Sequence, residues 1–408
     1  MHRCRYLPPR LAAVRLITRY VLSELLQVFL LTLAGLTAFI FIAMAGKEAV
    51  DKGLGIGPLL RMTPYLLPQA MQFAVPGTML LATTSVYGKM AAGNEVVALK
   101  SLGISPWKIA LPTFALATVI SFGAVMLNDV AVSWGRSGVE RVFIESIEEV
   151  VYGQLRVHRS FTRDKLHITV RRVEGRKLVQ PTVNGYFGDA TEPYTFTARW
   201  AELESQPAAD QLVIRLHQVE LDPSGNDVGF VDSETAELVF DVGHLLGGDG
   251  ARSPSNTALR EIDLARRAEQ RRLAEHGDDM TAQAAIALMT GELEQLTAEA
   301  WAPHEAAIAG ARATLNRLGA EPHRRWSTGF SCLGFVLVGV PVAVILRKGE
   351  FLASFFTCFA PILILYYPLL IVSLKQTKNG TLPPPTLWIG NLVLALVGLW
   401  LMRRVVRY

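Results

Sequence analysis

Residues 25–45 read LLQVFLLTLAGLTAFIFIAMA, an apolar run without a charge. A helix needs about 20 mostly apolar residues to cross the hydrocarbon core of a bilayer. Five further segments have this character, at approximately residues 65–87, 107–128, 328–346, 351–374 and 385–402. Prolines interrupt several of them, which membrane helices tolerate when their neighbours satisfy the freed carbonyls. The sequence therefore predicts a polytopic α-helical membrane protein with six transmembrane helices.

The composition agrees with this prediction. Hydrophobic residues make up 50% and charged residues 19% of the 408 residues, whereas soluble domains carry roughly 25% charged residues. The apolar runs enclose a polar middle from about Asp129 to Arg325. The net charge of +4 is mild and the basic residues cluster beside the apolar runs, so nucleic acid is not an expected partner. The three cysteines are an odd number, which argues against a disulfide framework.

The basic residues near the span ends predict the orientation, because cytoplasmic loops carry an excess of Lys and Arg. With a cytoplasmic N-terminus, thirteen Lys and Arg residues fall in short inner segments and five in short outer loops. We therefore expect both termini inside and the large middle region outside. Arg324 and Arg325 do not fit this orientation, since they precede the fourth span on its outer side. A cleavable signal peptide is the alternative for the first span, because Ala43-Met44-Ala45 has the A-x-A form, but the apolar run exceeds the usual 7–15 residues.

In the middle region the apolar residues recur with a period of two, as in β-strands. From about Val151 to Val242 apolar residues alternate with polar ones, as in residues 166–170 and 212–216, and turn signals such as Glu174-Gly175 and Asn184-Gly185 separate the runs. This pattern predicts an antiparallel sandwich, jelly roll or open barrel. Helical periodicity returns at residues 257–276 and 281–318. The expected domains are 1–128 (tail and spans 1–3), 129–256 (a jellyroll-like β domain), 257–325 (a helical segment) and 326–408 (spans 4–6).

Motifs of several enzyme classes are missing. The sequence has no G-x-x-x-x-G-K-[ST] phosphate loop, so we expect no ATP hydrolysis by that route, and no H-E-x-x-H, G-x-S-x-G or C-x-x-C motif. We therefore expect no catalytic residues, no bound metal and no cofactor. The spans are also nearly free of ionisable residues, which argues against a proton- or ion-coupled transporter.

The loop between spans two and three predicts a short surface helix. Asn94 suits an N-cap, Glu95 suits the positive end of a helix, and Gly103 suits the position after its C-terminus. The helix has two to three turns and places Val96, Leu99 and Gly103 along one face. It cannot span a membrane. On these residues alone it is a connector that offers Glu95 to the cytosol.

Residues 94–103, NEVVALKSLG, resemble the signature of the lipopolysaccharide-export permease family, the paired F and G subunits of the Lpt exporter. Three weaker stretches agree with this resemblance: residues 321–326 (EPHRRW), 339–341 (GVP) and 387–391 (LWIGN). The resemblance covers the whole chain in order. The chain departs from the family at residues 130–133, where a proline is common, and in the length of its helical segment 257–318.

The resemblance implies a permease subunit that extracts lipopolysaccharide from the outer leaflet of the bacterial inner membrane and passes it to periplasmic jellyroll domains. The implied partners are a cytoplasmic ABC ATPase dimer, which hydrolyses the ATP, a second related permease subunit and a single-span jellyroll accessory subunit. Glu95 then matches the acidic residue of the coupling helix, together with Asn94, Val96, Leu99 and Gly103.

Basic residues expected near the outer face are candidates for binding lipid phosphate, because Arg and Lys suit phosphate groups. They are Lys47, Lys52, Arg61, Arg136, Arg141, Arg324 and Arg325. Pairing with neighbouring carboxylates or ordinary anionic headgroups is the alternative for each. A second hypothesis for the whole chain is a scaffolding protein that couples a cytoplasmic ATPase to periplasmic partners without moving lipid.

Overall fold

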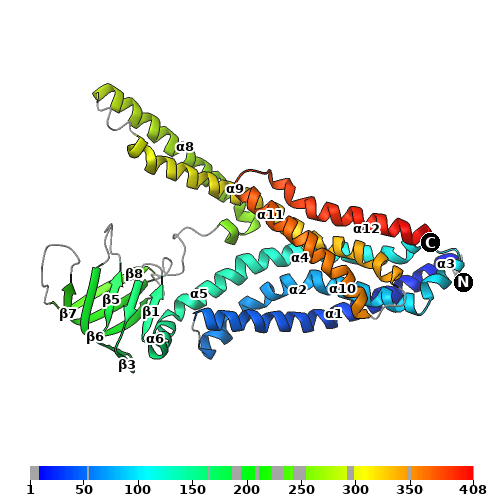
Figure 1. Ribbon diagram of the computed structural model, residues 1–408, viewed down its shortest axis with the longest axis horizontal. Helices are drawn as coiled ribbons and strands as arrows, with labels where there is room; N and C mark the ends of the chain where they lie inside the picture. The colour runs from blue at the N-terminus through cyan, green and yellow to red at the C-terminus, as the bar shows by residue number, and fades with distance from the viewer. Residues whose placement is uncertain are drawn as a thin grey trace, which may run out of the picture. The chain divides into compact units, whose positions relative to one another are not determined.

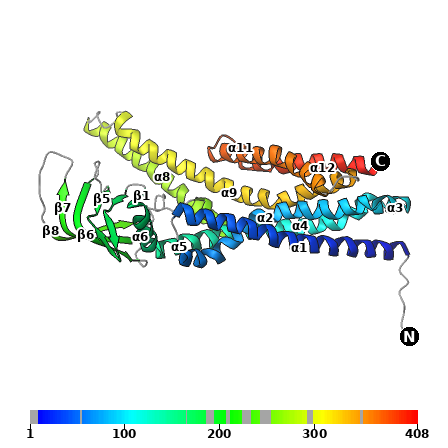
Figure 2. The ribbon, with the colours of Figure 1, turned by 60° about the horizontal axis from the view of Figure 1, so that its bottom comes forward.

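The computed structural model describes residues 9–52, 55–163, 166–185, 194–206, 211–222, 233–241, 254–291, 298–346 and 351–407. The chain divides into two compact units (Figures 1 and 2). The first unit holds Met1–Ile40, Pro68–Ser133 and Thr257–Tyr408, and the second holds Phe41–Leu67 and Trp134–Asn256. Helices α1 and α2 contribute to both.

The first unit is helical. Its elements are α1 (Pro9–Lys52) and α2 (Ile56–Ala92) in part, α3 (Glu95–Ser101), α4 (Pro106–Val130), α8 (Leu259–Thr290), α9 (Ala298–Ile345), α10 (Phe351–Pro361), the π-helical segment η4 (Ile362–Tyr366), α11 (Tyr367–Lys378), η5 (Pro384–Trp388) and α12 (Ile389–Arg407). The short 3-10 helix η2 (Pro254–Asn256) is the last element of the second unit. The π-helical segment follows Pro361, which lacks the N–H that a regular helix would use there.

Five helical stretches in the described part of the chain are long and apolar enough to cross a membrane: Leu16–Val50, Pro106–Glu145, Trp301–Ile345, Ala353–Lys378 and Pro384–Arg407. They coincide with five of the six predicted spans. The remaining one, residues 65–87, lies inside the continuous helix α2. It is less apolar because Gln69, Gln72, Pro68 and Pro76 interrupt it, so a sixth span stays a prediction.

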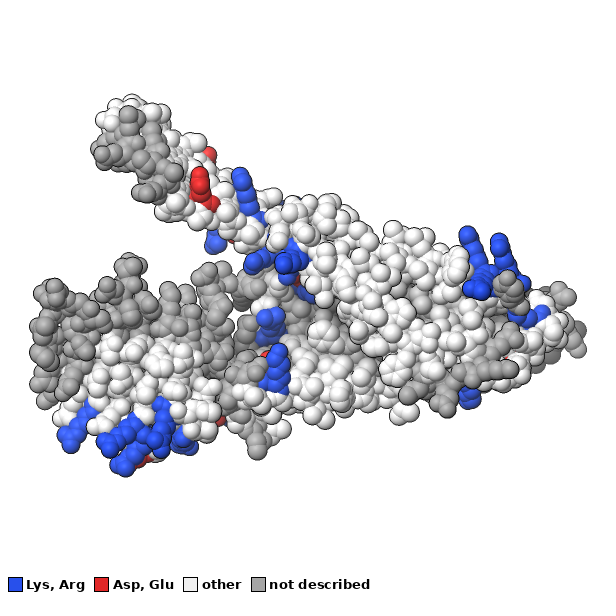
Figure 3. All heavy atoms as spheres, viewed as in Figure 1, with Lys and Arg blue, Asp and Glu red and all other residues white. Residues whose placement is uncertain are grey.

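Helix α9 is the centre of this unit and packs against α4 and α12. Small residues allow these helices to approach closely. A Cβ built on Gly398 of α12 would lie 2.6 Å from the backbone oxygen of Leu337, and one on Gly329 would lie 2.4 Å from Cγ2 of Val125. Figure 3 shows a broad uncharged surface over these helices, with Lys and Arg gathered toward their ends. Such a band fits the hydrocarbon core of a bilayer.

Helices α8 and α9 run side by side in both views (Figures 1 and 2). The sequence predicts one or two helices over residues 257–276 and 281–318, and the structure contains two, with other boundaries. Helix α8 continues through Gly277 and ends at Gly291, whose φ of +76° suits glycine at a helix C-terminus. Helix α9 passes from the hairpin into the span without a break at residues 325 and 326. A glycine inside a helix costs only about 1 kcal/mol relative to alanine, so the half-buried Gly277 does not interrupt α8.

The second unit joins helices to one antiparallel sheet. The π-helical segment η1 (Ala131–Arg136), α5 (Ser137–Glu145) and α6 (Ile147–His158) precede β1 (Ser160–Arg163), β2 (Leu166–Thr169), β3 (Arg172–Glu174), β4 (Lys177–Val179), β5 (Thr182–Gly185), β6 (Tyr194–Gln206), β7 (Gln211–Asp222) and β8 (Ser233–Asp241). A strand start near Val151 was therefore wrong, because α6 runs to His158 and buries Val151 against the sheet.

All strand pairs described are antiparallel, which confirms that part of the prediction. The long strand β6 pairs with β7 on one edge and with β5 and then β4 on the other. A turn follows Glu174 as predicted, formed by Gly175 and Arg176 between β3 and β4, with φ of +64° at Gly175. Asn184-Gly185 does not mark a turn, since both residues pair within β5. The choice among sandwich, jelly roll and barrel stays a prediction.

Tyr152 ties α6 to this sheet. Its hydroxyl accepts a hydrogen bond from the Leu203 amide at 3.0 Å and donates one to the Arg176 carbonyl. Burial raises the pKa of Tyr152, because the charged phenolate is disfavoured away from water. The neutral phenol therefore serves as both donor and acceptor inside the apolar core between helix and sheet.

Candidate functional site

The short helix α3 begins at Glu95, where the sequence predicts it, but its first turn is capped differently. Asn94 occupies the N-cap position, but its side chain makes no capping hydrogen bond. Its backbone instead adopts the left-handed region, with φ of 56°. Asparagine tolerates this region better than most residues. The chain thus reverses sharply between α2 and α3, and the predicted side-chain cap at Asn94 is wrong.

The end of α3 follows the prediction closely. Gly103 has φ of +77° and its amide donates to the Lys100 carbonyl at 2.9 Å, while the Ile104 amide donates to the Leu99 carbonyl at 3.1 Å. These two bonds define a Schellman motif, which satisfies carbonyls that the ending helix leaves without partners. Pro106 then begins α4. Both ends of α3 are therefore fixed by the backbone.

Helix α3 is seated on the ends of several longer helices. Val96 is 3% exposed and belongs to an apolar cluster with residues of α2, α4, α9 and α12, and Leu99 packs against the same cluster. Tyr87 at the end of α2 donates to the Ile109 carbonyl of α4 at 3.1 Å. Burial of Val96 and Leu99 couples α3 to the ends of the spans, whereas Gly103 is exposed and only completes the cap.

Charged groups add two further ties around this helix. The Lys100 ammonium donates to the Val405 carbonyl in the last turn of α12 at 3.1 Å, which satisfies a carbonyl at a helix C-terminus. Lys89 of α2 pairs with Glu24 of α1 at 2.6 Å, and this hydrogen bond raises the pKa of Lys89. Glu95 itself is exposed in the first turn of α3. A carboxylate at this place can bind a partner without any change in the fold.

The basic residues predicted to bind lipid phosphate fall into two groups. Lys47 of α1, Arg61 of α2 and Arg136 of η1 belong to the second unit, and all three are exposed. Arg141 of α5 is exposed as well. The side chain of Lys52 lies outside the described residues. Phosphate binding by these residues stays a prediction.

Arg325 does not fit the same prediction. Its side chain is completely buried, and its guanidinium donates to Asp129 of α4 at 2.5 Å and to the Thr257 carbonyl at 2.6 Å. Glu321 lies 3.7 Å from it on the preceding turn. Buried arginine needs such partners, because an unpaired charge is costly away from water. Arg325 therefore has no surface to offer a phosphate, and that prediction is wrong.

Arg324 is paired too, but remains 20% exposed. Its guanidinium donates twice to one oxygen of Glu321, at 2.7 and 2.9 Å. Together Arg324, Arg325, Glu321 and Asp129 carry two positive and two negative charges. The two arginines that resisted the count of basic residues are thus explained by carboxylates of the same chain.

Sequence reasoning missed Asp129, Glu321 and Lys100. Asp129 also accepts a hydrogen bond at 2.9 Å from the amide of Leu259, the first residue of α8. Its spacing of 196 residues from Arg325 leaves no local pattern. Glu321 could have been found, since an acid three or four residues before an arginine on a helix is within pairing distance. Within the described residues, no group of three or more His, Cys, Asp or Glu side chains could hold a metal ion.

Comparison with protein families decides the class of this molecule. The family described as lipopolysaccharide export system permease LptF/LptG matches residues 19–404, nearly the whole chain. The chain belongs to this family. A search of curated proteins finds no match.

Membership in the LptF/LptG family gives the chain the role of a permease component in lipopolysaccharide export. LptF/LptG proteins are components of a transporter complex and not enzymes of the usual kind, since ATP is hydrolysed by a separate subunit. The apolar helices agree with a multi-pass protein of the inner membrane. Helix α3 lies within residues 94–103, the stretch that resembles the signature of this family.

Proposed function

We propose that this chain is the permease subunit that couples ATP hydrolysis in a cytoplasmic ABC ATPase dimer to extraction of lipopolysaccharide from the outer leaflet. The observation that supports this proposal most is the construction of α3. A two-turn helix with exposed Glu95 is locked to four longer helices through Val96, Leu99 and Lys100. A partner that moves α3 therefore moves the ends of the spans.

The proposal includes six spans with both termini cytoplasmic, a periplasmic sheet unit of jellyroll type, and pairing with a second related permease. It also includes the single-span accessory subunit, to which lipid would pass next. Among the basic residues, exposed Lys47, Arg61 and Arg136 are the proposed contacts for lipid phosphates, with Lys52 beside them in sequence and Arg324 in a lesser role. Arg325 is excluded from this set because it is buried.

The coupling role is tested with Glu95→Ala in the complete transporter. Because Glu95 is exposed, we expect the variant to insert and fold as the parent does while ATPase co-purification and lipid-stimulated hydrolysis fall. A charge-matched control is Glu275→Ala, at an exposed position on α8. A Glu95→Ala transporter that retains its ATPase and full export would sink the coupling role. Photo-crosslinkers along α1 and α10–α11 test the substrate separately, by capture of lipopolysaccharide.

A further inference from the structure

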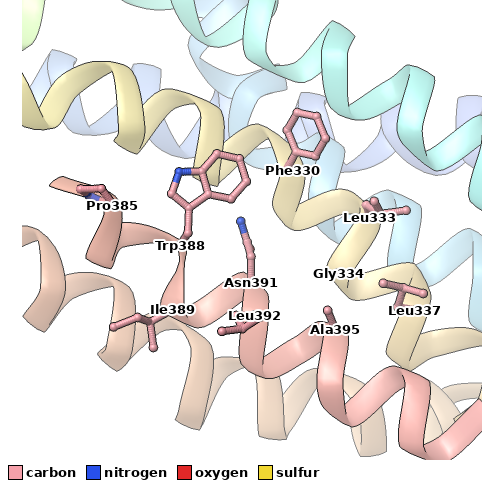
Figure 4. Close-up of a pocket in the computed structure, with 10 residues that line it drawn as sticks. All are labelled: Phe330, Leu333, Gly334, Leu337, Pro385, Trp388, Ile389, Asn391, Leu392 and Ala395. Atoms are coloured by element: carbon pink, nitrogen blue, oxygen red, sulfur yellow. The ribbon is translucent and has the colours of Figure 1, made fainter.

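A groove of about 370 Å³ lies between α9 and the η5–α12 segment (Figure 4). Phe330, Leu333 and Leu337 of α9 line one side, and Trp388, Leu392 and Ala395 line the other. Pro385, Ile389, Gly334 and Asn391 complete the lining. The amide nitrogen of Asn391 is engaged, since it donates to the backbone oxygen of Ser327 at 2.7 Å. The open surface of the groove is therefore almost wholly apolar.

The groove follows the axis of a membrane span. It extends from Pro385 to Ala395, and ten residues of helix rise about 15 Å. This length is about half the thickness of a bilayer core of roughly 30 Å. Trp388 lies toward the end of the groove where the chain leaves the apolar helix, as interfacial aromatics do. The groove thus matches one leaflet in depth.

Cations lie at the same end. Lys378, at the end of α11, is half-buried. It lies close enough to Arg317 and Arg324 of α9 for these like charges to repel one another. Hydroxyls of Thr377 and Thr386, 3.3 Å apart, join the end of α11 to η5. A Cβ built on Gly319 would lie 4.0 Å from Cγ of Pro384, which places the Arg317 turn beside η5.

This cluster is not neutralised within the part of the chain that the structure describes. Glu321 attracts Lys378, but it is already bonded to Arg324 and lies beside Arg325. No carboxylate forms an ion pair with Arg317 or Lys378 among the described residues. An anionic group is therefore the complementary ligand at this end, and an apolar chain is the complementary ligand below it.

We propose that the groove is a binding site for an anionic glycerophospholipid of the bilayer, with one acyl chain between α9 and α12 and the phosphate against Lys378 and Arg317. An apolar cavity of about 150 Å³ takes up one benzene molecule, so this groove of about 370 Å³ holds by proportion a chain of roughly 15 carbons. That is room for a single chain. A glycolipid with many chains would leave most of them outside, which is why we commit to a phospholipid.

The proposal of a phospholipid in this groove does not rest on the proposed function. A bound phospholipid would fill the surface where α9 and α12 diverge above Gly334 and Gly398, whose lack of side chains brings the two helices together. It would act as a structural ligand of the outer half of this helix pair.

Native mass spectrometry of the detergent-purified protein, titrated with dioleoylphosphatidylglycerol or dioleoylphosphatidylcholine, tests the site. We expect one phosphatidylglycerol to bind at least tenfold more tightly than any later one, and more tightly than phosphatidylcholine. Ala395→Phe fills the groove and should abolish this first binding event. Its control is Ala115→Phe, which adds the same volume at an exposed position of α4 outside the groove.

The role of the positive charges is tested by Arg317→Gln combined with Lys378→Gln. This variant should weaken the binding of phosphatidylglycerol roughly tenfold or more and leave the binding of phosphatidylcholine unchanged. Arg266→Gln with Arg271→Gln on α8 is the control. If Ala395→Phe fails to fold, the Arg317→Gln, Lys378→Gln variant still tests the site. The proposal is overturned if the parent protein binds the two phospholipids with equal affinity. It is also overturned if phosphatidylglycerol binds unchanged to Ala395→Phe and to the Arg317→Gln, Lys378→Gln variant, or if the site prefers lipid A to phosphatidylglycerol.

Discussion

Removal of the Asp129 carboxylate is the most direct test of how the hairpin of α8 and α9 is held. Asp129→Ala deletes an ion pair at 2.5 Å to the fully buried Arg325 and a hydrogen bond at 2.9 Å to the Leu259 amide. Breaking a buried pair from one side costs about 3–5 kcal/mol. We expect about 3 kcal/mol here, because the Asp129 side chain is 28% exposed and Glu321 still lies 3.7 Å from Arg325.

Hydrogen exchange at Leu259 reads this contact directly. Leu259 is the first residue of α8, so its amide has no partner within the helix and depends on Asp129. In detergent micelles, Asp129→Ala should speed exchange of this amide about tenfold and lower the thermal unfolding midpoint. Asp129→Asn keeps an oxygen for both hydrogen bonds but loses the charge, so it should show a smaller loss of stability and near-normal exchange.

The control is Asp263→Ala, an exposed aspartate on the same helix. If Asp129→Ala leaves both the Leu259 exchange rate and the unfolding midpoint within the range of this control, the reasoning about the buried cluster is refuted. A low midpoint with unchanged exchange would show that the charge matters and the cap does not.

Three further predictions concern a close helix contact at Gly398, the backbone of Gly103 and the hydroxyl of Tyr152. Gly398→Ala should destabilise the helix pair by about 2 kcal/mol or more through overpacking, measured as a lower unfolding midpoint, whereas Gly123→Ala, where nothing lies within 4 Å, should not. Gly103→Ala, at φ of +77°, should cost about 1 kcal/mol and lower lipid-stimulated ATPase activity. Tyr152→Phe should cost about 1–3 kcal/mol, seen in denaturant unfolding. The raised pKa of Tyr152 makes the folded state bind more protons above pH 10, so stability falls there as pH rises, and less in Tyr152→Phe.

Sequence alone located the features that depend on composition and local pattern. The apolar runs predicted five helices that the structure contains, and the period of two predicted antiparallel strands. Gly103 was predicted correctly because only its own backbone and the preceding turn are involved. Asn94 was placed correctly for the wrong reason, since the residue suits both a side-chain cap and a left-handed backbone.

What the sequence could not show is pairing between distant segments. Asp129 and Arg325 mark the two ends of the polar middle, yet nothing local reveals that they meet. Arg325 was read as a phosphate ligand because exposure was assumed for a charge. The break in the hairpin was placed near Gly277 and not at Gly291, because a glycine inside a packed helix and one that ends it look alike without the partner helix.

Helix α9 connects the two most informative regions of the first unit. Val344, near its end, belongs to the apolar cluster that buries Val96 of α3, and Arg325 lies 19 residues earlier in the same helix. At 1.5 Å per residue these points are about 28 Å apart along one continuous helix. Under the proposed coupling role, a displacement of α3 would reach the Asp129–Arg325 contact through one continuous helix and not through a loop.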